Sequence, residues 1–524
     1  MKLSDNESMD NLPVELIRAI AHFFDGTTLV TSLQVCRRWH LILHPLIWRL
    51  IQTTTWHNSR FPLREKELED PTKAITLLDD PKLVAALLHV QSLDWRSTHV
   101  AKGKKQKPRR QHSVLSLDTL GRIVGLTSNL VHLHLQSRYQ GKKFESLPLF
   151  VGYLHGLQSL RDLALLLSAD TDNLVAVDEL FPVFSRLDRL AISGLWVSPE
   201  RALGKEEKGV GEGHMEAQQS WRIKTLTVDT RLLSLARHCP SLVFLTAGYD
   251  FNKKPPTLET SSYSLRSLSR CQQLKCVMLP NAPNVGETID IADCLPSFSL
   301  PKFMRLLIPV TRPEDIECLN GGCRQEGTMV MPTLHHLHIL SVPSELENNR
   351  RLQLAIRKFL ISRTRLKWIY LSTITIEPEF VFAQPGKELE HGWGCGDKLH
   401  WISFKLPSST QWAARCLGSQ RDLLSSVYRQ LGCLTSLQVL EIECQIHLDL
   451  HMSGIRQLKG ATKLNKVTLI GFEQSWNREG IKALVEAVPG LKTLELRPLS
   501  EYHRQLVLGW LKDVGRPDVE LFTW

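Results

Sequence analysis

The segments LQVLEI (residues 437–442), LNKVTL (464–469) and LKTLEL (491–496) share apolar residues at positions one, four and six. The same spacing occurs fourteen times, about once in every 31 residues. A random leucine-rich chain would give some matches, but not this regular placement along most of its length. The copies begin at Val90, Leu130, Leu160, Leu187, Ile223, Leu242, Leu274, Phe303, Leu334, Leu366, Leu399, Leu437, Leu464 and Leu491.

Such a period is typical of leucine-rich repeats, in which each unit is a short strand followed by a returning helix. One unit cannot bury its apolar residues alone, so neighbouring units stack. The pattern therefore predicts an α/β fold, a curved solenoid with a parallel sheet on its concave face. The Asn or Cys that usually follows the last leucine is replaced, for example by Arg138 and Gln445, so irregular turns are expected.

A second pattern precedes the repeats, in the sequence LPVELIRAIAHFFDGTTLVTSLQVCRRWHLILHPLIWRL, which starts at residue 12. Leu12, Leu16 and Ile20 recur at the four-residue spacing of one helix face. Asp25 and Gly26 end this helix, and two more short apolar segments follow. The spacing alone predicts three short helices, which are compatible with an ordinary helical cap on a larger domain.

Three parts of this segment resemble the F-box family: Leu-Pro-x-Glu-Leu-Ile at 12–17, Val-Cys-Arg-Arg-Trp at 35–39 and Pro-Leu-x-Trp at 45–48. The resemblance implies a three-helix module that binds a Skp-type adaptor and, through it, a cullin–RING ubiquitin ligase. It does not separate adaptor contacts from the core of the module. The implied positions are Leu12, Pro13, Leu16, Ile20, Leu33, Val35, Cys36, Trp39 and Trp48.

The combination resembles F-box/leucine-rich-repeat proteins with irregular repeats, which implies a substrate-recruiting subunit of a Skp–cullin–F-box ubiquitin ligase. Two alternatives stay open: an F-box scaffold protein without a ligase role, and a basic repeat protein that binds nucleic acid. The expected division is a disordered N-terminus at 1–10, the F-box at 11–50, a helical linker at 51–89 and the repeat array at 90–524. Loop insertions are expected near 97–113, 198–219 and 376–397.

The client surface is expected on the exposed face of the sheet, where repeat positions three, five and seven point away from the core. Aromatic residues and arginine are common anchors of protein interfaces. Trp368 and Trp401 are expected side by side, unless a loop or the C-terminal tail covers them. The candidates are Arg305, His336, His338, Trp368, Tyr370, Trp401 and Lys405.

The net charge of +10 is concentrated in one short segment, so it does not favour a nucleic-acid-binding surface along the whole chain. This segment is compatible with a nuclear-import signal or with a solvated loop. Its basic residues are Lys102, Lys104, Lys105, Lys107, Arg109 and Arg110.

Other classes of protein are not favoured by the sequence. It has no apolar run long enough to span a bilayer and no secretory signal, and its eleven cysteines are scattered. We therefore expect a cytoplasmic or nuclear protein whose partners are the adaptor, the cullin scaffold and a protein client, with no membrane partner. Paired zinc ligands and catalytic motifs are not found, so we expect no metal, no cofactor and no enzymatic activity.

Overall fold

The computed structural model describes residues 12–52 (except 22, 25 and 49), 76–96 (except 77), 117–139, 147–169, 177–193, 220–228, 235–247, 268–279 (except 269), 302–308, 313–319, 333–339, 346–382, 393–407, 420–444, 454–471, 477–497 and 499–523. The chain divides into two compact units. The first contains residues 1–232, 238–240 and 250–256, and the second contains 233–237, 241–249 and 257–524. Within the described part, no helix combines the length and the apolar character needed to cross a membrane.

The first unit begins with the helices α1 (Val14–Ala21), α2 (Gly26–Ser32) and α3 (Arg37–Trp48). Pro13 precedes α1 and Glu15 lies in its first turn, a favourable place for a negative charge. The Arg38 guanidinium, in the first turn of α3, donates a 2.8 Å hydrogen bond to the carbonyl oxygen of Leu12, which precedes α1. The three helices enclose a small core of their own, formed by Ile17, Ala21, Trp39 and Leu43.

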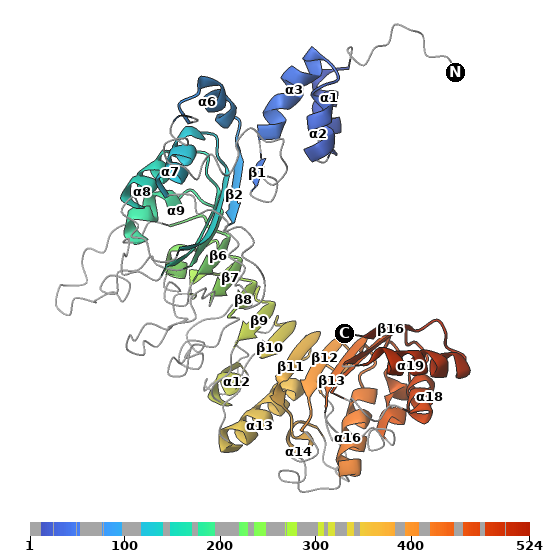
Figure 1. Ribbon diagram of the computed structural model, residues 1–524. Helices are drawn as coiled ribbons and strands as arrows, with labels where there is room; N and C mark the ends of the chain where they lie inside the picture. Colours follow the sequence, from blue (N-terminus) through green and yellow to red (C-terminus); the bar gives the residue numbers. More distant parts are fainter. Residues whose placement is uncertain are drawn as a thin grey trace, which may run out of the picture. The chain divides into compact units, whose positions relative to one another are not determined.

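The remaining elements of the first unit alternate between strands and helices (Figure 1). The strands are β1 (Leu50–Gln52), β2 (Ser92–Arg96), β3 (His132–Tyr139), β4 (Asp162–Ala169), β5 (Arg189–Ser193) and β6 (Thr225–Val228). The helices are α6 (Pro81–Leu87), α7 (Leu117–Leu126), α8 (Leu147–Gly156), the 3₁₀ helix η2 (Val177–Leu180) and α9 (Phe181–Phe184). Each strand pairs in parallel with the next one along the chain.

The second unit repeats this arrangement. Its strands are β7 (Phe244–Ala247), β8 (Cys276–Met278), β9 (Arg305–Ile308), β10 (His336–Ile339), β11 (Trp368–Thr375), β12 (Trp401–Lys405), β13 (Val439–Glu443), β14 (Lys466–Ile470), β15 (Thr493–Arg497) and β16 (Glu520–Thr523). Its helices are α12 (Pro313–Leu319), α13 (Leu346–Ser362), α14 (Pro378–Val381), α16 (Gln420–Gly432), η6 (Arg456–Gly460), α18 (Arg478–Ala487) and α19 (Glu501–Asp513). Its described strands pair in parallel, and the helices lie along one face of the sheet (Figure 1).

The predicted fold class is confirmed, because helices and parallel strands alternate after an N-terminal helical module. The fourteen sequence patterns coincide with β2 to β15, and their apolar positions stack between neighbouring strands. Leu440, Val467 and Leu494, for example, are aligned by the strand register and are all buried. Burying one such side chain contributes about 1.5–3 kcal/mol, so the stacked positions hold the repeats together.

Two strands, β1 and β16, were not anticipated from the sequence. In the strand register, Leu521 of β16 pairs with Leu494, but the first apolar position falls on Asp518 and the last on Thr523. In β1, Ile51 pairs with Leu93 while the last position is Thr53. The six-residue pattern is incomplete in both places, and only the neighbouring strand supplies the pairing.

A polar residue just before several repeat patterns connects that repeat to the preceding one. Asn129 donates to the carbonyl oxygen of Leu88 at 2.8 Å, and Thr333 donates to that of Phe303 at 2.7 Å. The Ser436 hydroxyl likewise donates to the carbonyl oxygen of Asp397 at 2.6 Å. These bonds satisfy backbone carbonyl groups at the turns that lead into the strands.

The division into domains stays a prediction. The expected disordered N-terminus and the insertions at 97–113 and 198–219 lie outside the described residues. Of the expected insertion at 376–397, residues 376–382 and 393–397 are described, and they include the short helix α14. The described part of the expected linker, 51–89, contains the end of β1 and helix α6.

Candidate functional site

The three N-terminal helices bury one set of apolar residues and expose another. Trp39 lies in the core of the module, and Leu12, Leu33 and Cys36 pack against that core. Pro13 is exposed, and for Trp48 only its place at the end of α3 is described. The candidate positions taken from the family resemblance therefore fall into two groups, which the sequence did not separate.

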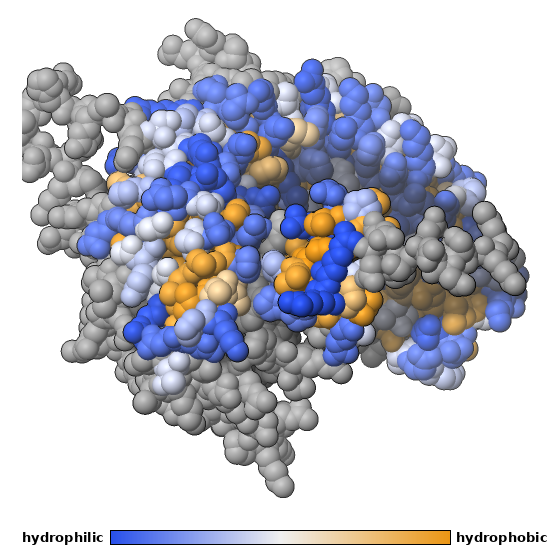
Figure 2. Space-filling model, turned by 90° about the horizontal axis from the view of Figure 1, so that it is seen from above, coloured by the Kyte–Doolittle hydropathy of each residue, from blue (hydrophilic) through white to orange (hydrophobic). Residues whose placement is uncertain are grey.

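The exposed group consists mainly of residues on or next to α1. Leu16 and Ile20 are both exposed, and Phe23, at the helical spacing that continues this row, is 90% exposed. Val35 is exposed in the turn before α3. Figure 2 shows that hydrophobic side chains gather into patches on the face of the molecule seen from above. We call Leu16, Ile20, Phe23 and Val35 the module's apolar residues.

Aromatic side chains form a row across β10, β11 and β12 of the second unit. The strand register aligns His336 with Trp368 and Trp368 with Trp401. The ring centroids of His336 and Trp368 are 5.2 Å apart, and those of Trp368 and Trp401 are 4.8 Å apart. His338 and Tyr370 form a second contact with centroids 4.1 Å apart. We call these five residues the aromatic ladder.

The ladder is continuous with Arg305 and partly open to solvent. Arg305 of β9 is aligned with His336 and is exposed. Trp368 is 41% exposed, an unusual amount for a tryptophan in a sheet. Six of the seven candidate client residues are thus brought together on four consecutive strands.

Lys405, the seventh candidate, belongs to a different group of side chains. A register shift in β11 aligns it with Thr375 rather than with a ladder residue, and its ammonium forms an ion pair with Glu443. On the next strands, Glu495 forms ion pairs with Arg497 and, at 3.1 Å, with Lys466. Burial alone would raise the pKa of Glu495, but these two cations outweigh burial and lower it. The charged side chains on this part of the sheet are therefore largely paired with one another.

The ladder histidines are neutral at pH 7. Burial, followed by the nearby charge of Arg305, lowers the pKa of His338 to about 4. Burial and then Arg305, His335 and Lys367 lower the pKa of His336. The charges that contribute to these two shifts are all cationic.

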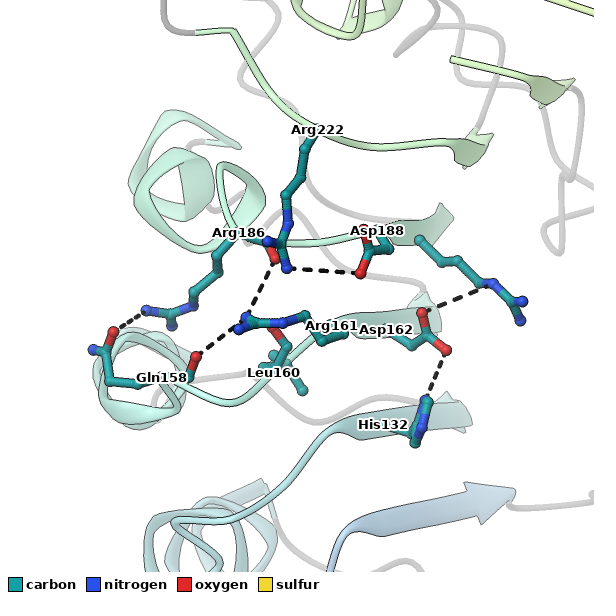
Figure 3. A network of polar contacts seen from close by, with 9 residues as sticks. His132, Gln158, Leu160, Arg161, Asp162, Arg186, Asp188 and Arg222 are labelled. Atoms are coloured by element: carbon teal, nitrogen blue, oxygen red, sulfur yellow. Dashed lines mark hydrogen bonds and ion pairs between the residues drawn. The ribbon is translucent and has the colours of Figure 1, made fainter. Parts of the chain in front are cut away.

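The first unit has a more polar sheet face. The Nδ1 atom of His132 lies 2.7 Å from Oδ2 of Asp162, whose Oδ1 lies 3.9 Å from Nε of Arg189 (Figure 3). On the neighbouring position, His134 lies 3.7 Å from Asp94. These described polar side chains of β2 to β5 contact one another, and no aromatic ladder follows them among the described residues of this unit.

Arginines at the turns of the first unit connect successive repeats. Arg186 donates hydrogen bonds to the carbonyl oxygens of Leu154 and His155 at the end of α8, at 2.6 and 3.1 Å. Arg161 donates to the carbonyl oxygens of Leu160 and Arg186 (Figure 3). Burial and the charge of Arg161 lower the pKa of Arg186. These side chains support the fold and leave the sheet face free for other contacts.

The described residues contain no cluster of three or more His, Cys, Asp or Glu arranged to hold a metal ion. Burial raises the pKa of the Cys271 thiol to about 12 and also raises that of Cys276, so both thiols are protonated at pH 7. Both side chains are buried in the core. The basic cluster, Lys102 to Arg110, lies outside the described residues.

Comparison with known families supports the separate character of the N-terminal helices. Residues 9–52 match the F-box-like family. The chain carries an F-box-like module. No curated protein matches the chain at a significant level.

Similar solved structures were also found. An internalin from Listeria monocytogenes is 11% identical, with a TM-score of 0.34, over 87% of this chain and 94% of the other. A chain of the TLR13–ssRNA13 complex is 12% identical, with a TM-score of 0.34, over 84% of this chain and 58% of the other. A chain of the yeast Rad7–Elc1 complex is 12% identical, with a TM-score of 0.31, over 100% of this chain and 99% of the other.

Some functional candidates were missed at the level of the sequence. Phe23 follows the row of Leu16 and Ile20, so the spacing of that row was the available signal. Lys405 and Glu443 occupy position seven of successive repeats, which was the available signal for their ion pair. Lys466 and Glu495 occupy different positions of their repeats, so their ion pair had no such signal. Their partners are set by the strand register.

Proposed function

We propose that this chain is a non-catalytic, substrate-recruiting subunit of a Skp–cullin–F-box ubiquitin ligase. The F-box-like module binds the Skp-type adaptor, and the repeat sheet of the second unit binds a protein client. The exposed apolar surface of the module carries this proposal. Leu16, Ile20 and Phe23 form an exposed apolar row beside the buried positions of α1, Ile17 and Ala21.

A helical module of this size gains little stability from its own core. Only four residues, Ile17, Ala21, Trp39 and Leu43, form the buried cluster of the F-box-like module. Exposed apolar patches on such modules are typical protein-binding surfaces, because covering them removes apolar area from water. The function known for the F-box family supplies the chemistry of the partner, a Skp-type adaptor.

The aromatic ladder supports the client half of the proposal. Trp368 offers a large apolar side chain to solvent beside Tyr370 and Arg305, and these residue types dominate binding energy at protein interfaces. The ladder lies in the second unit, whereas the F-box-like module lies in the first. The two proposed surfaces therefore share no residue.

The adaptor half is tested by replacing exposed residues of the module. We expect the double variant Leu16→Asp/Phe23→Asp to reduce recovery of adaptor and cullin in affinity purification at least about tenfold, because charge is placed in an apolar contact. Trp39 is unsuitable for this test because its replacement would empty the core of the module. Tyr502→Asp, at an exposed position on α19, is the matched control and should recover both partners normally.

The same purification distinguishes the alternatives. If the intact chain recovers no adaptor, the proposal is wrong. If it recovers adaptor but supports no ubiquitin transfer to captured proteins in a reconstituted reaction, the chain is a scaffold. If the chain instead recovers nucleic acid, and this binding is lost when the salt concentration is raised, the chain is a basic repeat protein that binds nucleic acid.

A further inference from the structure

The charge around the aromatic ladder is not balanced within the described part of the protein. Arg305 is exposed, and no hydrogen bond or ion pair joins its side chain to another described residue. The charges farther along the sheet are different, since Lys405 is paired with Glu443 and Lys466 with Glu495. Arg305 is thus a cation of this face that is available to a partner.

Apolar surface lies next to that cation in a fixed order. From β9 to β12 the aligned residues are Arg305, His336, Trp368 and Trp401. A partner that crosses these strands therefore meets a positive charge first and tryptophan rings afterwards. The neutral state of His336 and His338 leaves the guanidinium as the main charge on this path.

The spacing of the strands sets the spacing of the groups that a partner would need. Arg305 and Trp368 are two strands apart, which corresponds to about 10 Å at the usual separation of neighbouring strands. An extended peptide advances about 3.3 Å per residue. Successive side chains of an extended peptide point to opposite faces, so two side chains that reach the same sheet are two or four positions apart, which is about 7 or 13 Å. An acidic side chain and an apolar side chain at one of these spacings would reach Arg305 and Trp368 together.

Two other classes of partner fit this surface less well. Recognition of phosphorylated residues typically uses clusters of arginine, and the ladder borders a single arginine. Single-stranded nucleic acid requires a positively charged groove along its backbone as well as aromatic rings. Beyond Trp401 the cations Lys405, Lys466 and Arg497 are paired with Glu443 and Glu495, so they do not supply such a groove.

We propose that the aromatic ladder and Arg305 bind an extended acidic segment of the client, in which a carboxylate pairs with Arg305 and an apolar side chain two or four residues away packs on Trp368. The inference rests on the proposed function, because it specifies the client that the repeats recruit. The binding requires no modification of the client. The carboxylate gives specificity, and the tryptophan contact contributes most of the affinity.

The test uses the full chain in complex with its adaptor and a library of random ten-residue peptides. A second library contains one fixed phosphoserine. We expect peptides enriched from the first library to carry Asp or Glu two or four positions from a large apolar residue. Binding of an enriched peptide should weaken about tenfold or more on Trp368→Ala. Phe522→Ala, which alters another exposed aromatic residue of the same unit, is the control and should leave binding unchanged.

A reversal of charge tests the pairing directly. Arg305→Glu should weaken binding of the acidic peptide about tenfold or more, and replacing the peptide's acidic residue by lysine should restore binding to this variant. The proposal is overturned if no peptide is enriched, or if peptides are enriched only from the phosphoserine library. It is also overturned if Trp368→Ala leaves peptide binding unchanged. Recovery of adaptor is scored on the same samples. Loss of adaptor with intact peptide binding contradicts the proposed function alone, and the opposite result contradicts this inference alone.

Discussion

At the scale of single residues, His338 combines two roles on the sheet face. Its ring contacts Tyr370, and its Nε2 atom is buried without a hydrogen-bond partner among the described residues. Burial and the charge of Arg305 lower its pKa to about 4. The neutral ring is therefore part of the folded state, whereas the unfolded chain binds a proton at this residue near pH 6.5.

This difference predicts a pH dependence of folding stability. Between pH 6.5 and about 4 the unfolded chain takes up a proton at His338 that the folded protein does not, so the folded protein loses stability as the pH falls. His338→Phe preserves a ring beside Tyr370 but cannot titrate. In thermal unfolding, Tm of the variant should fall less than Tm of the natural chain over this range. Parallel curves would contradict the assigned pKa.

At the scale of elements, close packing between neighbouring repeats depends on two glycines. A Cβ atom at Gly432, the last residue of α16, would overlap the carbonyl oxygen of Gln457 in η6. A Cβ atom at Gly460, the last residue of η6, would in turn overlap the carbonyl oxygen of Gly432. The backbones of the two elements touch here, and a side chain on either glycine would force them apart.

Replacing Gly432 should therefore destabilise the second unit. We expect Gly432→Ala to lower the free energy of unfolding by about 2 kcal/mol or more, since a backbone contact cannot move aside as a flexible side chain can. Gly509→Ala in α19 is the matched control, because a Cβ atom there has no neighbour within 4 Å. This control should stabilise the protein by up to about 1 kcal/mol, the usual difference between glycine and alanine in a helix. Urea unfolding monitored by circular dichroism measures both, and equal effects would show that the contact at Gly432 is unimportant.

At the scale of the whole molecule, the proposed binding surfaces belong to different units. The module's apolar residues lie in the first unit, and the aromatic ladder lies in the second. Mutations at separate sites without shared partners are usually additive. Loss of one proposed activity is therefore expected to leave the other intact.

The double variant Trp368→Ala/Trp401→Ala tests this independence. It should reduce client capture to background and leave adaptor recovery within about twofold of the natural chain, since no F-box-like residue is altered. Leu16→Asp/Phe23→Asp should give the opposite result. Quantitative mass spectrometry of the purified complexes measures both partners at once. If the tryptophan variant still captures clients, the aromatic ladder is not the client-binding surface.

The sequence by itself determined the fold class and the positions of β2 to β15. Each repeat contributes the same local pattern, and buried leucines at fixed spacing are visible without knowledge of the neighbouring repeat. It also indicated that Trp368 and Trp401 are neighbours, because equal positions of successive repeats align in a parallel sheet. The strand register confirms this pairing.

The tertiary structure decided which residues of a local pattern are buried and which are exposed. Leu16 and Trp39 are both apolar members of the same motif, yet only the packing of three helices places Trp39 inside and Leu16 outside. Charge is decided in the same way. Lys405 is at position seven of its repeat and Arg305 is at position three. A residue from the next repeat neutralises Lys405, whereas Arg305 has no such partner among the described residues. Burial and ion pairing depend on contacts between segments far apart in the chain, which the spacing within one repeat does not show.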